Sequence, residues 1–396
     1  MNANVGKEKA AHEALGVPLC TDGRLFVREG DGVARYSRAL HAALEVIDPA
    51  LLVVHDRFSA VPRGKTEFER VRRWTEARIA PGTVRLRERP PGILMARDVF
   101  RRAHSHYKRR GTLLRLVAPE VVPGLVHWSY PMPIELVGWR NVYTIHDTIP
   151  LTHPHLTTID VDLHRRLLAA IGARATAIAT ISEAARTDII DTLSLAPDKV
   201  VDLGQSVDVG TGTDPLPAGL TAGAYFLFVG GDNPRKNGER VLQAWRQSGA
   251  VRPLVMIGPG DRWKGEPGTV RLPFQPDGTL AALIAGARAL VFPSLGEGFG
   301  RPIAEAMALG TAVLTARGHA TEEVAGGAAL LVDPLDAAEI ARGIAALDRD
   351  DALVERLKQA GRQRAPAFAR DGFARRLVSF YVSLIASTEP SPYASR

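Results

Sequence analysis

One stretch, VFPSLGEGFGRPIAEAMALGTAVLT from Val291 to Thr315, constrains the fold of this chain more than any other. It reads as a short buried strand, a glycine-rich turn, a helix from about Pro302 to Leu309 and a second strand. Pro302 suits the first helical position and Gly310 suits the position after the last turn, so both helix ends are marked. Strand, turn, helix and strand in this order predict a doubly wound α/β domain.

Two carboxylates flank the turn: Glu297 lies in the loop, and Glu305 follows eight positions later in the predicted first helical turn. Between them, Gly298, Phe299 and Gly300 can bring backbone N–H groups close to a ligand, because glycine leaves no side chain in the way. The helix start adds unpaired amides and a positive dipole end. These groups predict a site for a polyanion that carries polyol hydroxyls. Taken alone, the pair favours the alternative that Glu297 is an ordinary loop acid and that Glu305 complements the helix dipole, whereas the surrounding GEGFGRPIAEAMALG favours a binding site.

The context GEGFGRPIAEAMALG resembles the signature of the retaining glycosyltransferases of family 4, in which seven residues separate two glutamates. The resemblance implies the GT-B architecture, an α/β fold whose two Rossmann-like, doubly wound domains face each other across a cleft. It also implies that Glu297 orients the sugar of a nucleotide-sugar donor and that Glu305 holds the ribose hydroxyls. Family 4 transfer needs neither a metal nor another cofactor, so none is expected here.

A chain of 396 residues is too long for one ordinary core, so two domains are expected. After about residue 203 the composition changes to GQSVDVGTGTDPLPAGLTAG, which is typical of a linker. We therefore predict a Rossmann-like acceptor-binding domain over 1–205, a linker over 206–223 and a Rossmann-like nucleotide-sugar domain over 224–370. The resemblance implies that a last helix, 371–388, crosses back to the first domain.

The composition indicates a cytoplasmic protein. The chain has one cysteine, Cys20, which excludes an internal disulfide and a cysteine zinc site. The first residues, MNANVGKEKAAHEALG, lack the apolar core and cleavage site of a signal peptide. The sequence contains no run of about 20 apolar residues, which is the length that would predict a membrane-spanning helix.

Positive charge is concentrated in one region. The net charge is +7, yet residues 57–115 alone hold seventeen Lys or Arg against five acids. This predicts a basic face suited to a lipid-linked diphosphate acceptor or to the anionic inner face of the cytoplasmic membrane. No nucleic-acid-binding signature accompanies the charge, so nucleic acid is not an expected partner. A solvated arginine-rich surface is the alternative. The segment DVFRRAHSHYKRRGTLLRLV, which ends this basic region, fits either a helix on a membrane surface or a helix packed on the domain.

Three residues of the N-terminal half are candidates for the same site. Gly32 opens GVARY, which resembles the family's GIGRY except that Ala34 replaces the second glycine; a simple turn is the alternative. His146 leaves a predicted strand, 142–146, and carboxyl ends of parallel strands point into the ligand crevice. Its HDTIPL context resembles the family's HDLIPL, which implies that His146 faces the donor sugar. Ser182 in ATISEAARTDI is either a cleft residue or an N-cap, and both roles are compatible.

The C-terminal half begins with a predicted strand, Tyr225 to Val229, that runs into GGDNPRKN. A helix starting near Pro234 would place Arg235 and Lys236 in its first turn, where positive charge opposes the helix dipole. A bound anion would remove that conflict, because the amides and both cations could then hold it. PRKN resembles the family's diphosphate-binding segment. Many relatives carry an additional Arg where this chain has Gly230.

The acidic pair Asp160 and Asp162 has the spacing of a metal motif but lies at a predicted helix start and not at a strand end, so we predict no metal site there. The combination GVARY, HDTIPL, PRKN and EGFGRP resembles bacterial mannosyltransferases that use GDP-mannose to build surface polysaccharide. It implies retaining transfer of a hexose to a saccharide or lipid-linked saccharide. UDP-glucose, UDP-N-acetylglucosamine and dTDP-rhamnose stay open as donors. A GT-B epimerase and a non-catalytic nucleotide-sugar-binding module stay open as other functions.

Overall fold

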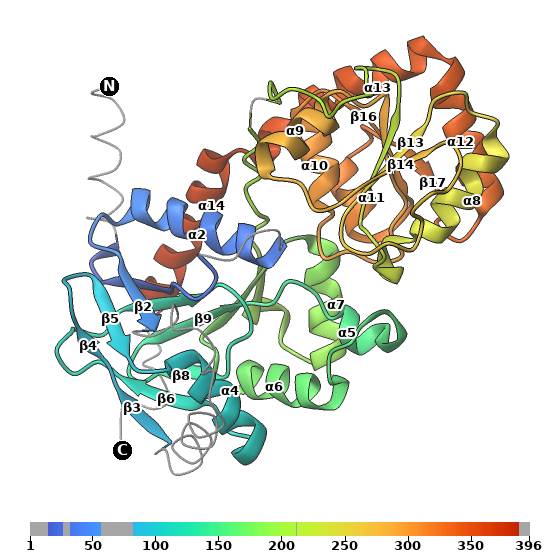
Figure 1. Cartoon of the computed structure of the whole chain (residues 1–396). Coiled ribbons are helices and arrows are strands. Elements are labelled where there is room, and N and C mark those ends of the chain that lie inside the picture. The colour runs from blue at the N-terminus through green and yellow to red at the C-terminus, as the bar shows by residue number, and fades with distance from the viewer. Residues whose placement is uncertain (1–14, 27–31, 57–81, 211, 388–396) are drawn as a thin grey trace, which may run out of the picture.

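The computed structural model describes residues 15–26, 32–56, 82–210 and 212–387. They form two α/β domains, coloured from blue to green and from yellow to orange in Figure 1. Each domain is built around a largely parallel sheet with helices packed on it, as the alternation of strands and helices in the sequence predicts. Among the helices of these residues, none is both long and apolar enough to cross a membrane.

The first domain holds an eight-stranded sheet in the order β11-β10-β9-β7-β1-β2-β5-β4. Neighbouring strands are parallel except β4 and β5, which are antiparallel. Strands β1, β7 and β10 are buried at every residue, which fits central strands covered on both faces. The strands are β1 (Leu19–Asp22), β2 (Leu52–Asp56), β4 (Arg87–Glu88), β5 (Ile93–Ala96), β7 (Leu125–Trp128), β9 (Arg140–Thr144), β10 (Ala177–Thr180) and β11 (Val200–Asp202).

A second, three-stranded parallel sheet in the order β3-β6-β8 flanks this one, and the sequence analysis did not predict it. Its strands are β3 (Thr83–Arg85), β6 (Leu114–Val117) and β8 (Ile134–Leu136). The described helices of the domain are α2 (Gly32–Ile47), α4 (Val99–Arg110), α5 (Ile149–Thr152), α6 (Val161–Arg174) and α7 (Glu183–Leu193), with short 3-10 turns η1 (Pro154–Leu156) and η2 (Pro197–Lys199). Asp160 caps α6 by accepting a hydrogen bond from the N–H of Leu163, which is a structural role.

Helix α4 lies in the arginine-rich region. Its aromatic side chains, Phe100 and Tyr107, are buried in the core of the first domain. Of the two arrangements that the sequence allowed, α4 therefore adopts the packed one, because these side chains are not available to dip into a lipid surface. Its last turn still presents exposed cations. Residues 57–81, where much of the predicted basic face falls, lie outside the described residues.

The second domain contains a fully parallel sheet in the order β14-β13-β12-β15-β16-β17. This is the 3-2-1-4-5-6 order of a Rossmann fold, whose ligands bind where the order reverses, here between β12 and β15. Its strands are β12 (Phe226–Val229), β13 (Leu254–Ile257), β14 (Thr269–Leu272), β15 (Ala289–Phe292), β16 (Ala312–Ala316) and β17 (Leu330–Val332). Its helices are α8 (Gly238–Ser248), α9 (Asp277–Ala285), α10 (Arg301–Ala308), α11 (His319–Ala325), α12 (Ala337–Arg349) and α13 (Asp351–Arg364).

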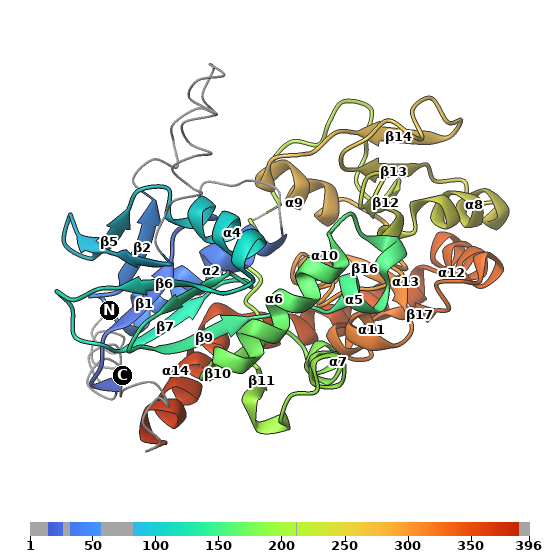
Figure 2. The same cartoon turned by 90° about the horizontal axis from the view of Figure 1, so that it is seen from below.

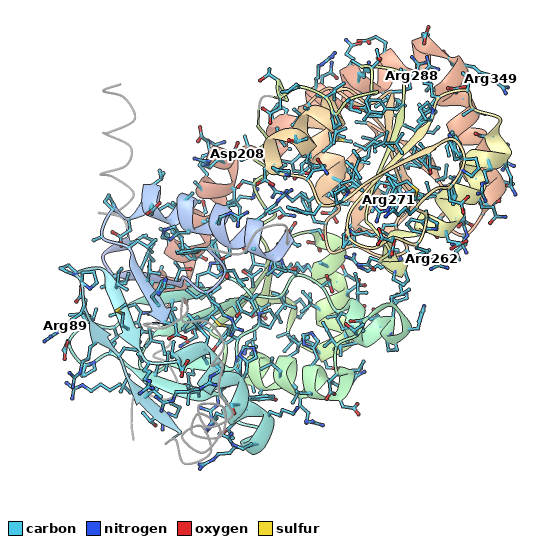
Figure 3. The ribbon with its side chains drawn as sticks, viewed as in Figure 1. Arg89, Asp208, Arg262, Arg271, Arg288 and Arg349 are labelled. Atoms are coloured by element: carbon cyan, nitrogen blue, oxygen red, sulfur yellow. The ribbon has the colours of Figure 1, made fainter. Side chains whose placement is uncertain are left out.

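Helix α14 (Arg370–Ala386) leaves the second domain and packs along α2 of the first (Figure 1). The hydroxyl of Tyr381 in α14 lies 2.6 Å from Nδ1 of the buried His127 in β7. At the start of the helix, Arg370 pairs with Asp208 of the connecting segment, labelled in Figure 3. The helix therefore ties the connection between the domains to the first domain, as the resemblance to family 4 implies.

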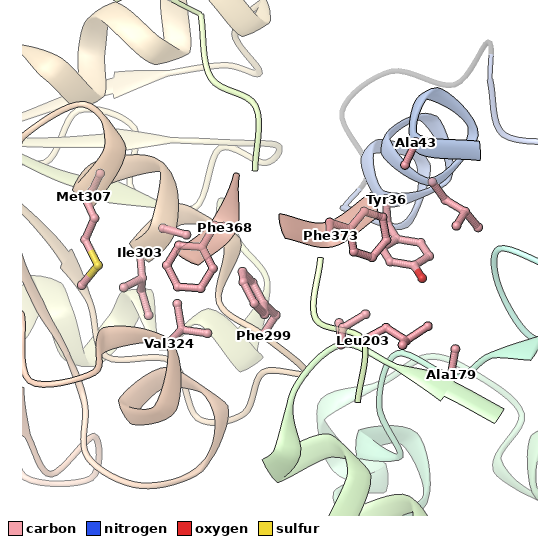
Figure 4. Close-up of a cluster of buried hydrophobic side chains, with 14 of the residues drawn as sticks. Tyr36, Ala43, Ala179, Leu203, Phe299, Ile303, Met307, Val324, Phe368 and Phe373 are labelled. Carbon is pink, nitrogen blue, oxygen red and sulfur yellow. The ribbon is translucent and has the colours of Figure 1, made fainter. Parts of the chain in front are cut away.

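One apolar cluster continues from the first domain into the second (Figure 4). On one side, the rings of Tyr36 in α2 and Phe373 in α14 lie 6.1 Å apart. On the other, Phe299 of the glycine-rich loop meets Phe368 of the 3-10 turn η4 (Ala365–Phe368), with ring centroids 5.5 Å apart. The loop that carries the candidate site is thus anchored beside the segment that joins the two domains.

Candidate active site

A cavity of about 780 Å³ lies between the two domains at the carboxyl ends of their central strands. Residues of both domains line this cavity, so the fold brings together positions that are far apart along the chain. Nine of the ten predicted site residues are among them: Gly32, His146, Arg235, Lys236, Glu297, Gly298, Phe299, Gly300 and Glu305. The exception is Ser182, which is buried behind the loop.

Glu297 is the centre of the charged wall of this cavity. Its Oε2 accepts a hydrogen bond from Arg235 Nη1 at 2.7 Å, and its Oε1 accepts one from Lys236 Nζ at 2.7 Å. The hydroxyl of Ser294, just after β15, lies 2.6 Å from Oε1. The Lys236 ammonium also lies 4.8 Å above the ring of Phe292, which adds a cation–π contact. The carboxylate is therefore held from several sides at once.

Burial and neighbouring charges act in opposite directions on these groups. Burial by itself would raise the pKa of Glu297, but Lys236 and Arg235 lower it from 4.5 to about 2. Burial lowers the pKa of Lys236, and Glu297 opposes that shift. Glu297 is consequently ionised at neutral pH, and two cationic side chains share one carboxylate. Two cations therefore stand on the cavity wall, where they can bind an anion, and the charge of Asp147 of the first domain, which also lines the cavity, acts to raise the pKa of both.

The turn that carries the two cations differs from the prediction. The sequence predicts Arg235 and Lys236 in the first turn of a helix that begins near Pro234. The structure instead shows a 3-10 turn, η3 (Pro234–Lys236), and α8 begins at Gly238. Asn237 separates the two with a left-handed φ of 67°, and its side chain donates to the carbonyl of Pro293 at 2.9 Å. Both cations therefore stand just before α8, still near the positive end of its dipole, and not within its first turn.

Gly230 supports Lys236 by leaving space. A Cβ atom at Gly230 would lie 2.5 Å from Cβ of Lys236 and 2.9 Å from the ring of Phe228. The position where many family 4 proteins carry an arginine is thus filled here by the lysine side chain itself.

Glu305 lies deeper in the helix than predicted. It is the fifth residue of α10 and not part of its first turn, so it is not placed to complement the helix dipole. Its Oε1 accepts a hydrogen bond from Arg301 Nε at 2.8 Å and another from Arg35 Nη1 at 2.9 Å. Arg35 belongs to α2 of the first domain and also pairs with Asp277 at the start of α9. The second carboxylate of the signature therefore takes part in a contact between the domains.

The glycines of the loop serve two different purposes. A Cβ atom at Gly298 would lie 2.4 Å from the carbonyl oxygen of His146, so this glycine allows the loop to approach the first domain closely. Gly300 has a φ of 94°, a left-handed conformation that few side chains tolerate, and it precedes α10. The side chain of Phe299 is buried against Phe368. Phe299 can therefore offer a ligand only its backbone.

His146 lies two residues beyond β9, which ends earlier than predicted, at Thr144. Its Nε2 is 3.0 Å from the carbonyl oxygen of Ser129, and its ring meets the edge of Tyr36 with centroids 4.8 Å apart. These contacts hold the imidazole at the cavity, where it lies opposite the loop of the second domain. Gly32 is the first residue of α2 and also lines the cavity, with open space around its Cα.

Ser182 is an N-cap and does not line the cavity, so of the two roles that its sequence allowed the structure shows the cap. Its oxygen caps α7 by accepting the N–H of Ala185 at 3.1 Å, and its hydroxyl donates to the carbonyl of Gly298 at 2.7 Å. Nearby, Glu323 of α11 accepts the N–H groups of Glu183 and Ala184 at 2.9 and 2.8 Å. Figure 2 shows α7 and α11 side by side at this junction. The second domain therefore hydrogen-bonds the first backbone N–H groups of α7.

Three polar residues that hydrogen-bond to the two glutamates were not identified from the sequence as site residues: Ser294, Arg301 and Arg35. Ser294 follows a buried strand, and the rule that strand ends face the ligand crevice could have identified it. Arg301 is four residues before Glu305, a spacing at which helical side chains meet. Arg35 lies within the GVARY motif, but nothing local indicated its partner, because that carboxylate lies 270 positions away.

The second domain matches a known family. A sequence model described as "Glycosyl transferases group 1" matches residues 220–364, which include all strands of the second sheet. The chain is 29% identical over 276 residues to the O-antigen chain mannosyltransferase B of Escherichia coli, a match covering 61% of this chain and 70% of that protein. It is 30% identical over 225 residues to the MMP alpha-(1->4)-mannosyltransferase of Mycolicibacterium hassiacum, covering 52% of this chain and 54% of that relative.

Solved structures share the fold over most of the chain. HepE of Anabaena, crystallised with UDP and glucose, has a TM-score of 0.65 to this structure at 14% identity, covering 93% of this chain and 100% of HepE. At that identity the likeness bears on the fold alone. Together with the two parallel sheets, it confirms the predicted GT-B class of two Rossmann-like domains.

Proposed function

Because this chain carries a domain of the glycosyl transferases group 1 family, we propose that it moves a hexose from a nucleoside-diphosphate sugar to a hydroxyl of a saccharide or lipid-linked saccharide. The observation that carries the proposal is the cluster of Arg235, Lys236 and Glu297, which places two cations and a carboxylate on the cavity between the domains. A sugar diphosphate presents the complementary groups, a dianion and hydroxyls, in one molecule.

In the proposed reaction, the bond between the anomeric carbon and the diphosphate oxygen breaks as the acceptor oxygen bonds to the same carbon. Negative charge grows on the departing diphosphate, and Arg235 and Lys236 stabilise it without a metal ion. Their contacts with Glu297 then loosen, and the carboxylate becomes available to the sugar hydroxyls and to the positive anomeric carbon. The acceptor proton goes to an oxygen of the leaving phosphate, and the configuration at the anomeric carbon is retained.

The first domain supplies the opposite wall in this proposal. His146 extends from the end of β9 toward the cavity, where it hydrogen-bonds a sugar hydroxyl. Glu305 receives the ribose hydroxyls, while Gly32 and the backbone of the 298–300 loop allow close approach of the donor. Ser182 acts indirectly, since its hydroxyl holds the carbonyl of Gly298.

Mannose from GDP-mannose is the proposed donor, because the two matched relatives are named mannosyltransferases. The name of the first relative further supports a place in bacterial surface polysaccharide synthesis. We propose that the protein acts in the cytoplasm, and that exposed cations at the end of α4, such as Arg109 and Arg110, contribute a peripheral contact with an anionic membrane or a lipid-linked acceptor.

The test is a donor panel with purified protein in EDTA. Binding and slow hydrolysis of GDP-mannose, UDP-glucose, UDP-N-acetylglucosamine and dTDP-rhamnose are followed for the wild type, for Glu297→Ala and for Glu355→Ala. The last removes an exposed glutamate of the same domain and serves as the matched control. We expect one donor to be hydrolysed by the wild type and by the control but not by Glu297→Ala, with the released sugar appearing first as the donor's anomer.

Other outcomes separate the alternatives. Binding of a sugar nucleotide without turnover, even with saccharide acceptors, would indicate a binding module. Conversion of the donor into an epimer would indicate an epimerase. Activity that EDTA abolishes and a divalent ion restores would contradict the metal-independent mechanism. If no nucleotide binds, the proposed donor site is wrong.

A further inference from the structure

Four residues form a wall between two cavities. Arg35, Leu280, Arg301 and Glu305 line both the 780 Å³ cavity of the proposed donor site and a second cavity of about 290 Å³ behind it. Arg35 comes from the first domain, and the others come from the second. The polar part of the wall is therefore a contact across the domain boundary.

Glu305 is enclosed in this wall. Its side chain is 6% exposed, and that of Arg35 is 14% exposed. A carboxylate oxygen offers two lone pairs, and Oε1 already accepts one hydrogen bond from Arg35 and one from Arg301. A vicinal diol binds a carboxylate best by donating one hydrogen bond to each oxygen. With Oε1 occupied twice, only Oε2 could accept from such a diol.

We propose that Arg35 is a latch: it holds Glu305 across the domain boundary, and the ribose diol of the bound nucleotide displaces it from Oε1. The inference rests on the proposed function, which assigns the ribose to Glu305. Binding of the ribose and the contact of Arg35 with Glu305 then exclude each other. Because such coupling is reciprocal, the latch weakens nucleotide binding by the same factor by which the nucleotide weakens the latch.

The fold provides a place for the displaced guanidinium. Nη2 of Arg35 already pairs with Asp277, whose side chain is 68% exposed at the start of α9. Arg35 can therefore lose its hydrogen bond to Glu305 and still keep a carboxylate partner, Asp277. Glu305 likewise keeps Arg301, so neither charge is left buried without a partner when the latch opens.

Nucleotide binding to Arg35→Met tests the latch. Affinities of GDP and UDP are measured by calorimetry for the wild type, Arg35→Met, Arg35→Lys and Arg370→Met. Arg370 lines the second cavity and pairs with Asp208, so its replacement removes the same charge without touching Glu305. The 2′,3′-dideoxy forms of both nucleotides are measured alongside, because they lack the hydroxyls that compete with Arg35.

We expect Arg35→Met to bind the preferred ribonucleotide at least about fivefold more tightly than the wild type, the lower end of typical coupling between sites. Arg35→Lys should fall between the two, and Arg370→Met should equal the wild type. The dideoxynucleotide should bind the wild type and Arg35→Met equally, which a general loosening of the domains would not produce.

Three results would overturn the latch. Weaker ribonucleotide binding by Arg35→Met would mean that Arg35 helps to hold the donor. An equal gain for the ribonucleotide and its dideoxy form would mean that the ribose does not compete with Arg35. If neither GDP nor UDP binds any of the proteins, including the wild type, the proposed function fails and the latch fails with it.

Discussion

Replacement of Glu297 by glutamine tests the charge arrangement at the centre of the site. The side chain is 8% exposed and pairs with both Arg235 and Lys236. The difference between a pKa of 4.5 in the unfolded chain and about 2 in the folded protein corresponds to about 3 kcal/mol of folding free energy. Glutamine keeps the shape but leaves two cations facing each other. We expect Glu297→Gln to lose about 3 kcal/mol of unfolding free energy at pH 7.

The pH dependence of this loss has a definite sign. The pKa of Glu297 is lower in the folded protein than in the unfolded chain, so its contribution is complete above about pH 4.5 and disappears as the pH falls toward 2. Glu297→Gln lacks that titration. The difference in unfolding free energy between wild type and variant should therefore be largest at pH 7 and fall to about half by pH 3.

Urea unfolding, followed by fluorescence at several pH values, measures the effect. The double variant Glu297→Gln with Lys236→Met has one cation fewer, so it should be more stable than the single variant by at least about 1 kcal/mol. Glu355→Gln changes an exposed ion pair, 67% exposed on the glutamate, and should cost less than about 1 kcal/mol. Two results would contradict the idea that Glu297 holds two mutually repelling cations. One is a loss of unfolding free energy in Glu297→Gln no larger than in Glu355→Gln, and the other is a double variant no more stable than Glu297→Gln.

Three further substitutions test the supports of the site. His127→Leu should cost about 1–3 kcal/mol at pH 7.5, because the buried hydroxyl of Tyr381 loses its partner. Burial lowers the pKa of His127 from 6.5 to about 3, so the stability of the wild type falls as the pH drops below 6.5. In urea titrations, the difference in unfolding free energy between the wild type and the variant should therefore narrow by up to about 1.4 kcal/mol per pH unit. Gly230→Ala should displace Lys236 and weaken calorimetric GDP binding about tenfold without unfolding the protein; unchanged binding would refute the steric argument. Glu323→Ala should speed amide exchange at the start of α7, where two N–H groups lose their acceptor, whereas exchange elsewhere in α7 stays unchanged.

Elements with marked ends and buried runs were predictable from the sequence. The helix predicted from about Pro302 to Leu309 is α10 (Arg301–Ala308), and the strand predicted from Tyr225 to Val229 is β12 (Phe226–Val229), since proline and glycine mark these ends. The sheet β3-β6-β8 was not predicted. Its strands are only three or four residues long, and β3 lies within the arginine-rich region, so neither alternation nor composition distinguishes them from loops.

The site itself was predictable where its chemistry is local. The glutamates, the PRKN cations and His146 each stand beside a strand end or a glycine-rich turn, and all of them line one cavity. The start of α8 was misplaced because Asn237 adopts a left-handed conformation after Pro234, and nothing in the residue pattern distinguishes that turn from a first helical turn. Contacts between the domains, such as those of Arg35 and Glu323, join positions far apart in the chain, and the local sequence does not indicate which residues meet.

The two glutamates of the signature are each held by two cations, but the cations differ in origin. Both hydrogen-bond partners of Glu297, Arg235 and Lys236, belong to the second domain, and Asp147 of the first domain acts on these two cations only through its charge. Glu305 takes one partner, Arg35, from the first domain. A change in domain spacing therefore breaks or forms a direct hydrogen bond of Glu305 and leaves the direct hydrogen bonds of Glu297 in place. In the proposed donor site, the carboxylate at the ribose end would gain or lose a partner with domain contact, and the carboxylate at the diphosphate end would keep both of its partners.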